Sequence, residues 1–133
     1  MVDTRDSAFP AGYGPPALAA GGTRDFIATG RCGIPTGAQA ISANATVTAT
    51  AGAGFVSLYP TASAFPGVST VNYTAAGQTV ANAAIVPLGA DGGFTSVAGV
   101  SGTEFIVDVN GYFAGTIVTT SVNGLTGAVT QAP

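Results

Sequence analysis

The stretch Phe105-Ile106-Val107-Asp108-Val109-Asn110-Gly111-Tyr112-Phe113 decides the fold class of this chain. β-Branched and aromatic residues make up most of it, and this composition favours an extended strand. Side chains alternate between the two faces of a strand, so Phe105, Val107 and Val109 share one face. The run closes on Asn110-Gly111, a pair typical of tight turns. We therefore expect a core strand that ends at this turn, where the compact part of the chain finishes.

The sequence upstream repeats the same strand signal. Apolar and polar residues alternate strictly from residue 41 to residue 50, with Ile41, Ala43, Ala45, Val47 and Ala49 on one face and Ser42, Asn44, Thr46, Thr48 and Thr50 on the other. We expect further strands near the N-terminus and at residues 24–29, 55–59, 68–74, 79–88 and 94–98, separated by Gly- and Pro-rich turns. This spacing predicts an all-β fold, an antiparallel β-sandwich of the jelly-roll or immunoglobulin-like type.

Composition agrees with one such domain and limits its partners. The chain has 133 residues, of which 20 are Gly and 8 are Pro, too many for long helices. Charged residues make up only 7%, and Lys and His are absent. That balance argues against nucleic-acid binding, which depends on clustered Lys and Arg. No apolar run is long enough to span a membrane, and the N-terminal residues lack the basic-then-apolar pattern of a signal peptide. So little charge suits a protein that packs against its own copies or is displayed outside a cell.

The residues that catalysis or metal binding needs are nearly all missing. With no His and a single Cys, Ser-His and Cys-His pairs and thiolate metal sites are excluded. We interpret Cys32 as a small buried hydrophobic residue beside a Gly turn. A calcium site would have to use Asp91 or Asp3 with loop carbonyls, and no Asp-rich loop surrounds either of them. We predict a non-enzymatic protein with no catalytic, cofactor-binding or metal-binding residue.

Asp108 requires an explanation because it lies in the middle of an apolar strand. If its side chain points outward, it is an ordinary solvated carboxylate. If it points inward, burial requires a cationic partner, and Arg5 and Arg24 are the candidates. Our hypothesis is an Asp108–Arg5 pair that fastens the N-terminal strand to residues 105–113.

Residues 115–133 differ in character from residues 1–114, which we assign to the sandwich. Residues 117–122 and 125–130 flank Asn123-Gly124, a strong hairpin signal. A lone two-stranded hairpin is marginally stable in water, so this tail should pair with the body or with a neighbouring subunit. The predicted assembly residues of the tail are Val122, Asn123, Gly124, Leu125 and Val129.

Several blocks occur in an order that resembles a known β-rich module. They are Asp3-Thr4-Arg5, residues 30–35 (Gly-Arg-Cys-Gly-Ile-Pro), residues 44–48 (Asn-Ala-Thr-Val-Thr), residues 55–60 (Phe-Val-Ser-Leu-Tyr-Pro), Asn72-Tyr73 and residues 106–113. The module recurs in secreted and cell-surface proteins of bacteria, often in tandem or beside cell-wall enzymes, and in phage structural proteins. The resemblance covers about residues 2 to 114 and implies a non-catalytic display or adhesion unit.

The tail carries a second resemblance. Residues 121–130 (Ser-Val-Asn-Gly-Leu-Thr-Gly-Ala-Val-Thr) are similar to a segment common in phage tail and head fibre proteins, where it tends to join trimeric pieces. Together the two resemblances imply a bacteriophage virion structural protein, a capsid decoration or head/tail fibre protein on the virion surface. Its expected partners are its own copies in a homotrimer, other virion proteins such as the major capsid or fibre protein, and a host surface glycan. No nucleic acid, membrane insertion or cofactor is expected.

The alternative is a bacterial extracellular β-sandwich module. It would bind cell-wall or other glycans, or form a surface filament by donating its terminal strand to a neighbour. Under either interpretation the exposed loops, such as residues 61–67 and 99–103, would face the environment. The contact candidates are Phe65, Tyr13 and Tyr59, with Tyr73 and Tyr112 as further members of a sugar-stacking platform.

Overall fold

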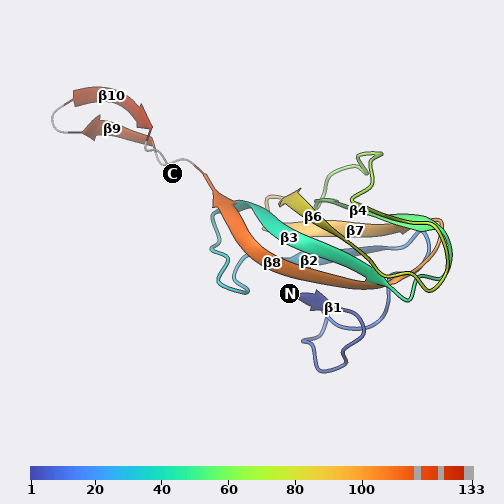
Figure 1. Ribbon diagram of the computed structural model, residues 1–133. Helices are drawn as coiled ribbons and strands as arrows, with labels where there is room; N and C mark the ends of the chain where they lie inside the picture. Colours follow the sequence, from blue (N-terminus) through green and yellow to red (C-terminus); the bar gives the residue numbers. More distant parts are fainter. Residues whose placement is uncertain (116–117, 123–124, 131–133) are drawn as a thin grey trace.

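The computed structural model (Figure 1) describes residues 1–115 with their side chains and the backbone of residues 118–122 and 125–130. Every regular element in this part of the chain is a β-strand. The strands are β1 (Val2–Asp3), β2 (Thr23–Ile27), β3 (Ala38–Thr48), β4 (Gly54–Pro60), β5 (Val71–Tyr73), β6 (Val80–Pro87), β7 (Gly93–Gly99), β8 (Glu104–Ala114), β9 (Val118–Val122) and β10 (Leu125–Thr130). The predicted all-β class is confirmed, and a strand forms at each predicted place, although the one predicted at residues 68–74 is shortened to Val71–Tyr73.

Two four-stranded antiparallel sheets pack into a sandwich, visible as two layers in Figure 1. Their strand orders are β1-β8-β3-β6 and β2-β7-β4-β5. The first strand pairs with the eighth, the second with the seventh, the third with the sixth and the fourth with the fifth. The immunoglobulin sandwich keeps its first two strands in one sheet, whereas β1 and β2 lie in different sheets here. The order is therefore that of the eight-stranded jelly roll.

The core lies between the sheets and follows from strand alternation. In β3, Ile41, Ala43, Ala45 and Val47 are buried, as the alternating pattern predicts. Ala49 is exposed instead, because its φ of 48° takes it out of the strand. Three aromatic rings fill the centre, with Phe26 of β2 5.5 Å from Phe94 of β7 and 6.5 Å from Phe105 of β8. These rings, contributed by both sheets, hold the two layers together.

Strand β8 does not end at Asn110-Gly111, so the predicted turn is wrong. The strand continues to Ala114 and stays paired with β3. Gly111 lies opposite Ser42 and Val109 opposite Ala43, which leaves Asn110 as the extra residue of a β-bulge. A hairpin turn needs a following strand that folds back, but residues 112–114 pair with residues 38–41 of β3.

The C-terminal hairpin is confirmed in its two strands. β9 and β10 pair antiparallel, with Leu125 opposite Val122 and Thr130 opposite Val118, and they form a two-stranded sheet of their own. The predicted turn residues Asn123 and Gly124 lie outside the described residues.

Candidate interaction surface

The N-terminal strand is fastened to β8, but not by the predicted ion pair. Asp108 is exposed, as the outward alternative for its side chain requires. Arg5 binds Asp3 in a bidentate pair, with Nη2 to Oδ2 at 2.8 Å and Nε to Oδ1 at 2.9 Å. The guanidinium of Arg5 holds the pKa of Asp3 below its usual range. The hypothesis of an Arg5–Asp108 pair is therefore wrong, because a carboxylate two residues away reaches Arg5 at a smaller entropic cost.

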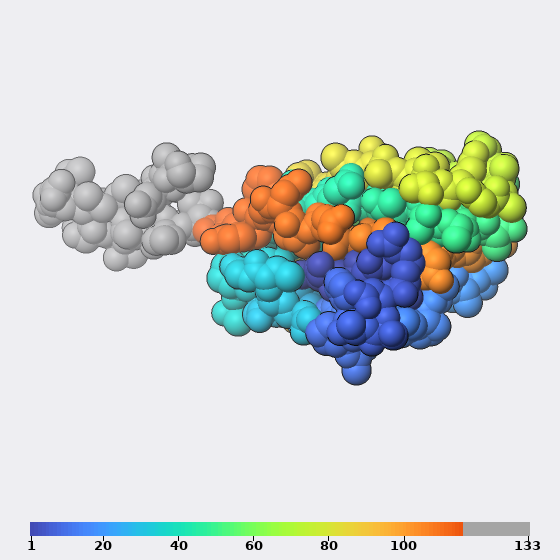
Figure 2. All heavy atoms as spheres, turned by 60° about the horizontal axis from the view of Figure 1, so that its bottom comes forward, coloured from blue at the N-terminus to red at the C-terminus, as the bar shows by residue number. Residues whose placement is uncertain are grey.

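Thr4 provides the fastening instead. Its side chain is buried, and its Oγ1 accepts a hydrogen bond from the Phe105 N–H at 2.8 Å. The same hydroxyl donates to the carboxylate of Glu104. The Thr4 N–H donates to the Phe105 carbonyl at 3.0 Å, so residue 4 satisfies both backbone groups of Phe105 just after β1 ends. Figure 2 shows the N-terminal residues, in dark blue, over the orange β8.

Of the three predicted contact residues, Phe65 alone presents an exposed ring. Tyr59 is buried at 8% exposure, so its prediction as an exposed contact is wrong. Tyr13 is half-buried, donates its hydroxyl to the Ile27 carbonyl at 2.8 Å, and places its ring 3.7 Å from the Arg31 guanidinium. Both side chains therefore serve packing rather than outside contact.

Phe65 lies on the loop between β4 and β5 and is 48% exposed. Its ring stacks on Phe55 with centroids 6.1 Å apart, and it meets the edge of Tyr59 at the same distance. Val68, on the same loop, is 64% exposed. Residues 62–67 are exposed, as predicted for this loop. In the predicted loop of residues 99–103 only Val100 is exposed, at 80%, and Thr103 is buried.

The carboxylate of Asp91 stabilises the turn between β6 and β7. It accepts a hydrogen bond from the Thr61 hydroxyl and another from the Gly93 N–H at 2.9 Å. These two donors lower the pKa of Asp91 from its ordinary value. Asp91 and Asp3 are thus both engaged by hydrogen-bond donors, and the described part of the chain contains no group of three metal-ligating side chains.

Cys32 is exposed, which overturns its interpretation as a buried residue. Its φ of 51° places it in the left-handed region, in the turn of residues 31–34 that the Ile34 N–H closes on the Arg31 carbonyl at 2.8 Å. Tight turns of this kind lie at the surface, where the Cys32 side chain is exposed.

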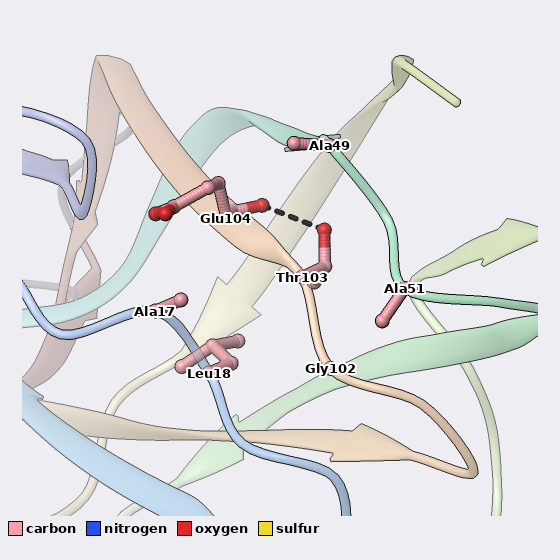
Figure 3. A pocket seen from close by; sticks show the side chains of 7 residues that line it. All are labelled: Ala17, Leu18, Ala49, Ala51, Gly102, Thr103 and Glu104. Atoms are coloured by element: carbon pink, nitrogen blue, oxygen red, sulfur yellow. Dashed lines mark hydrogen bonds between the residues drawn. The ribbon is translucent and has the colours of Figure 1, made fainter. Parts of the chain in front are cut away.

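A shallow hollow of about 260 Å³ lies between the N-terminal segment and the ends of β3 and β8 (Figure 3). Its lining is Ala17, Leu18, Ala49, Ala51, Gly102, Thr103 and Glu104. The Thr103 hydroxyl lies 3.0 Å from the Thr48 carbonyl and 2.8 Å from that of Glu104, and the Glu104 carboxylate accepts from Thr4. Since its polar side chains are already hydrogen-bonded within the protein, the hollow offers few groups to orient a ligand.

The outer face of the first sheet carries an apolar surface that the sequence analysis missed. Ile85 is 59% exposed on β6, and Phe113 is 52% exposed at the end of β8. Ala40 of β3 lies between Pro87 and Phe113 in one row across the sheet. Alternation along residues 79–88 puts the side chains of Ile85 and Val86 on different faces of their strand. Only the strand order shows that Ile85 shares the outer face with Phe113. Ile85 lies in the neighbouring row, opposite Ser42, and together with Pro87, Ala40 and Phe113 it forms this apolar surface.

Comparison with protein-family models, with curated proteins and with solved structures gave no match. Among the described residues no helix is long and apolar enough to cross a membrane. The described side chains thus present exposed apolar groups on loops and on the outer face of the first sheet.

Proposed function

We propose that this chain is a non-enzymatic virion structural protein of a bacteriophage, a capsid decoration or fibre protein that works by oligomeric packing and surface display. The C-terminal hairpin carries this proposal. β9 and β10 form an isolated two-stranded sheet, and such a sheet is marginally stable in water without further strands or a hydrophobic partner. Copies of the same hairpin, brought together in a trimer, would supply that partner.

Two further features support the same function. The jelly roll is common in viral capsid domains, although a fold alone does not determine function. Only 7% of the residues are charged, so copies can approach one another with little electrostatic repulsion. In this proposal the sandwich faces outward from the virion surface, with Phe65 and Val68 on the exposed β4–β5 loop as contacts to other virion proteins or to a host surface glycan.

Native mass spectrometry of the full chain tests the proposal. We expect closed assemblies whose mass is three chains or a multiple of three. Leu125→Asp and Val129→Asp, which place charge in the hairpin, should release smaller species. Val68→Asp is the matched control, because it adds the same charge to an exposed loop of the sandwich. A full chain that is monomeric and binds peptidoglycan would favour the adhesion module instead, and open-ended polymers would favour a filament subunit.

A further inference from the structure

β6 is a long sheet edge with a free row of backbone groups. It pairs with β3 through eight consecutive residue pairs without a bulge, and no strand lies on its other side within the described residues. The Leu88 N–H donates to the Gln39 carbonyl at 2.9 Å, so residues 39 and 88 form a hydrogen-bonded pair between the two strands. Hydrogen-bonded pairs alternate along an antiparallel ladder. The backbone groups of Val80, Asn82, Ala84 and Val86 therefore face β3, and those of Ala81, Ala83 and Ile85 face outward.

The other three edges of the two four-stranded sheets are short or covered. β1 has two residues, and its Asp3 N–H donates to the Tyr13 carbonyl at 3.0 Å. β5 has three residues. β2 carries Arg24, whose guanidinium binds the carbonyls of residues 12, 14 and 16 and so draws the N-terminal loop over that side. Proteins protect exposed edges with such devices, whereas on β6 the protecting proline, Pro87, stands only at the end of the strand and leaves residues 80–86 uncovered within the described chain.

β6 also lacks the charge that would keep another strand away. Its sequence, Val-Ala-Asn-Ala-Ala-Ile-Val-Pro, contains no ionisable side chain and no inward-pointing charge. The neighbouring outer-face residues of β3 are Ser42, Asn44 and Thr46, which are polar and uncharged. Asp108 lies across β3 from β6, and Asp3 lies beyond β8. Figure 2 shows the yellow residues around β6 along one rim of the molecule.

We propose that β6 is a self-association surface, on which β6 of a second copy pairs antiparallel about a twofold axis at Ala83. In this register Ala83 faces Ala83 of the second copy, and Ala81 faces Ile85 at both ends. Each of these three pairs presents an outward N–H and an outward C=O, so the pairs exchange about six hydrogen bonds. Pro87 has no N–H and ends the ladder.

The same pattern explains why the partner is a second copy. A twofold axis at Ala83 brings each outward N–H of one β6 opposite an outward C=O of the other, so this edge is complementary to itself, as a twofold interface requires. On the outer face the large Ile85 lies beside the small Ala81 of the other chain. The resulting continuous eight-stranded sheet joins two sandwiches edge to edge. This contact uses none of the tail residues, so it holds whether or not the hairpin trimerises.

Hydrogen exchange measured by NMR tests the ladder directly on the full chain. The amides of Asn82, Ala84 and Val86 should be protected at every protein concentration, since they bind β3. The amides of Ala81, Ala83 and Ile85 should exchange fast at low concentration and become protected as concentration rises. Exchange of these three amides that is fast at all concentrations would refute the proposal.

Ala83→Pro removes the central outward N–H without touching the ladder to β3, because proline is tolerated on an edge with its nitrogen toward solvent. We expect the dissociation constant of the β6 contact to rise at least about 30-fold, from the loss of two hydrogen bonds. Ala83→Val keeps the N–H and is the matched control. Sedimentation velocity should show that Ala83→Pro loses the larger species formed by β6 pairing, whereas Ala83→Val keeps it. Any trimer made by the tail should persist in both variants. Equal masses for wild type and Ala83→Pro would overturn the proposal.

The register has its own test, which also applies if the proline variant fails to fold. Ala81→Glu and Ile85→Lys, both at exposed positions, should each weaken association. The double variant places the new carboxylate at position 81 beside the new ammonium group at position 85 of the other copy, at both ends, and should restore association. Ala81→Glu combined with Ala83→Lys sets two lysines opposite each other and should not restore it. Equal affinity of the two double variants would show that another segment, such as the hairpin, occupies the edge.

Discussion

Thr4→Val removes a buried hydroxyl while keeping the shape of the side chain. The hydroxyl is the acceptor for the Phe105 N–H at 2.8 Å, and that N–H is buried. Valine offers no acceptor, so the N–H loses its partner where water cannot replace it. An unsatisfied buried donor costs about 1–3 kcal/mol, and we expect the free energy of unfolding to fall by about 2 kcal/mol. Thr4→Ser keeps the hydroxyl and loses one methyl group, a change worth about 0.8 kcal/mol.

Urea unfolding at a fixed protein concentration measures both changes. With a slope of about 1.5 kcal/mol per molar urea, Thr4→Val should lower the midpoint by about 1.3 M, and Thr4→Ser by about 0.5 M. A Thr4→Val variant as stable as Thr4→Ser would refute the role of the hydroxyl.

Arg5→Ala and Asp108→Ala should have additive effects on the free energy of unfolding, because the structure joins Arg5 to Asp3 and not to Asp108.

Three further outcomes follow from side chains on the two sheets and their loops. Gly99→Ala should destabilise the fold by about 1–3 kcal/mol, since its Cβ would meet the ring of Phe55. Combining it with Phe55→Ala should remove part of that cost, as urea unfolding would measure. The pKa of Asp91 is lower in the folded state, so it contributes stability at pH values above its ordinary 3.8 that is lost as the pH falls through the folded pKa. Asp91→Asn should flatten this part of the urea midpoint's pH dependence, and an unchanged profile would contradict the assignment. Cys32 should react with a maleimide in the folded protein nearly as fast as in urea, because it is exposed; slow labelling that urea accelerates would contradict that.

Local pattern predicted the strands well because each strand is encoded by its own residues. The alternation in residues 41–50 led to β3 and to its buried face. The Asn-Gly signal at residues 123–124 correctly predicted the pairing of β9 with β10 on either side of it. The same dipeptide at residues 110–111 was misleading, because β3 is long enough to keep β8 paired past it and the extra residue becomes a bulge.

Features that depend on tertiary placement could not be predicted from the chain. The partner of Arg5 and the exposure of Tyr59 are decided by which strands become neighbours. The free edge of β6 is of the same kind, since its sequence suits an inner strand equally well and only the strand order makes it the last in its sheet. Cys32 differs, because Gly30 and Gly33 in the sequence already indicate a turn, and turns lie at the surface.

The nested pairing of the strands determines when the protein can fold during synthesis. β4 and β5 meet first, but β2 must wait for β7 and β1 for β8, with Val2 and Val107 more than a hundred residues apart. Such distant pairings make folding slow, because a long loop must close before the contact is gained. The N-terminal strand leaves the ribosome first but is the last strand of the sandwich whose partner is synthesised. Until β8 emerges, the nascent chain therefore exposes the apolar side chains of β2 and β3, and a chaperone that binds extended apolar segments would be most useful in that interval.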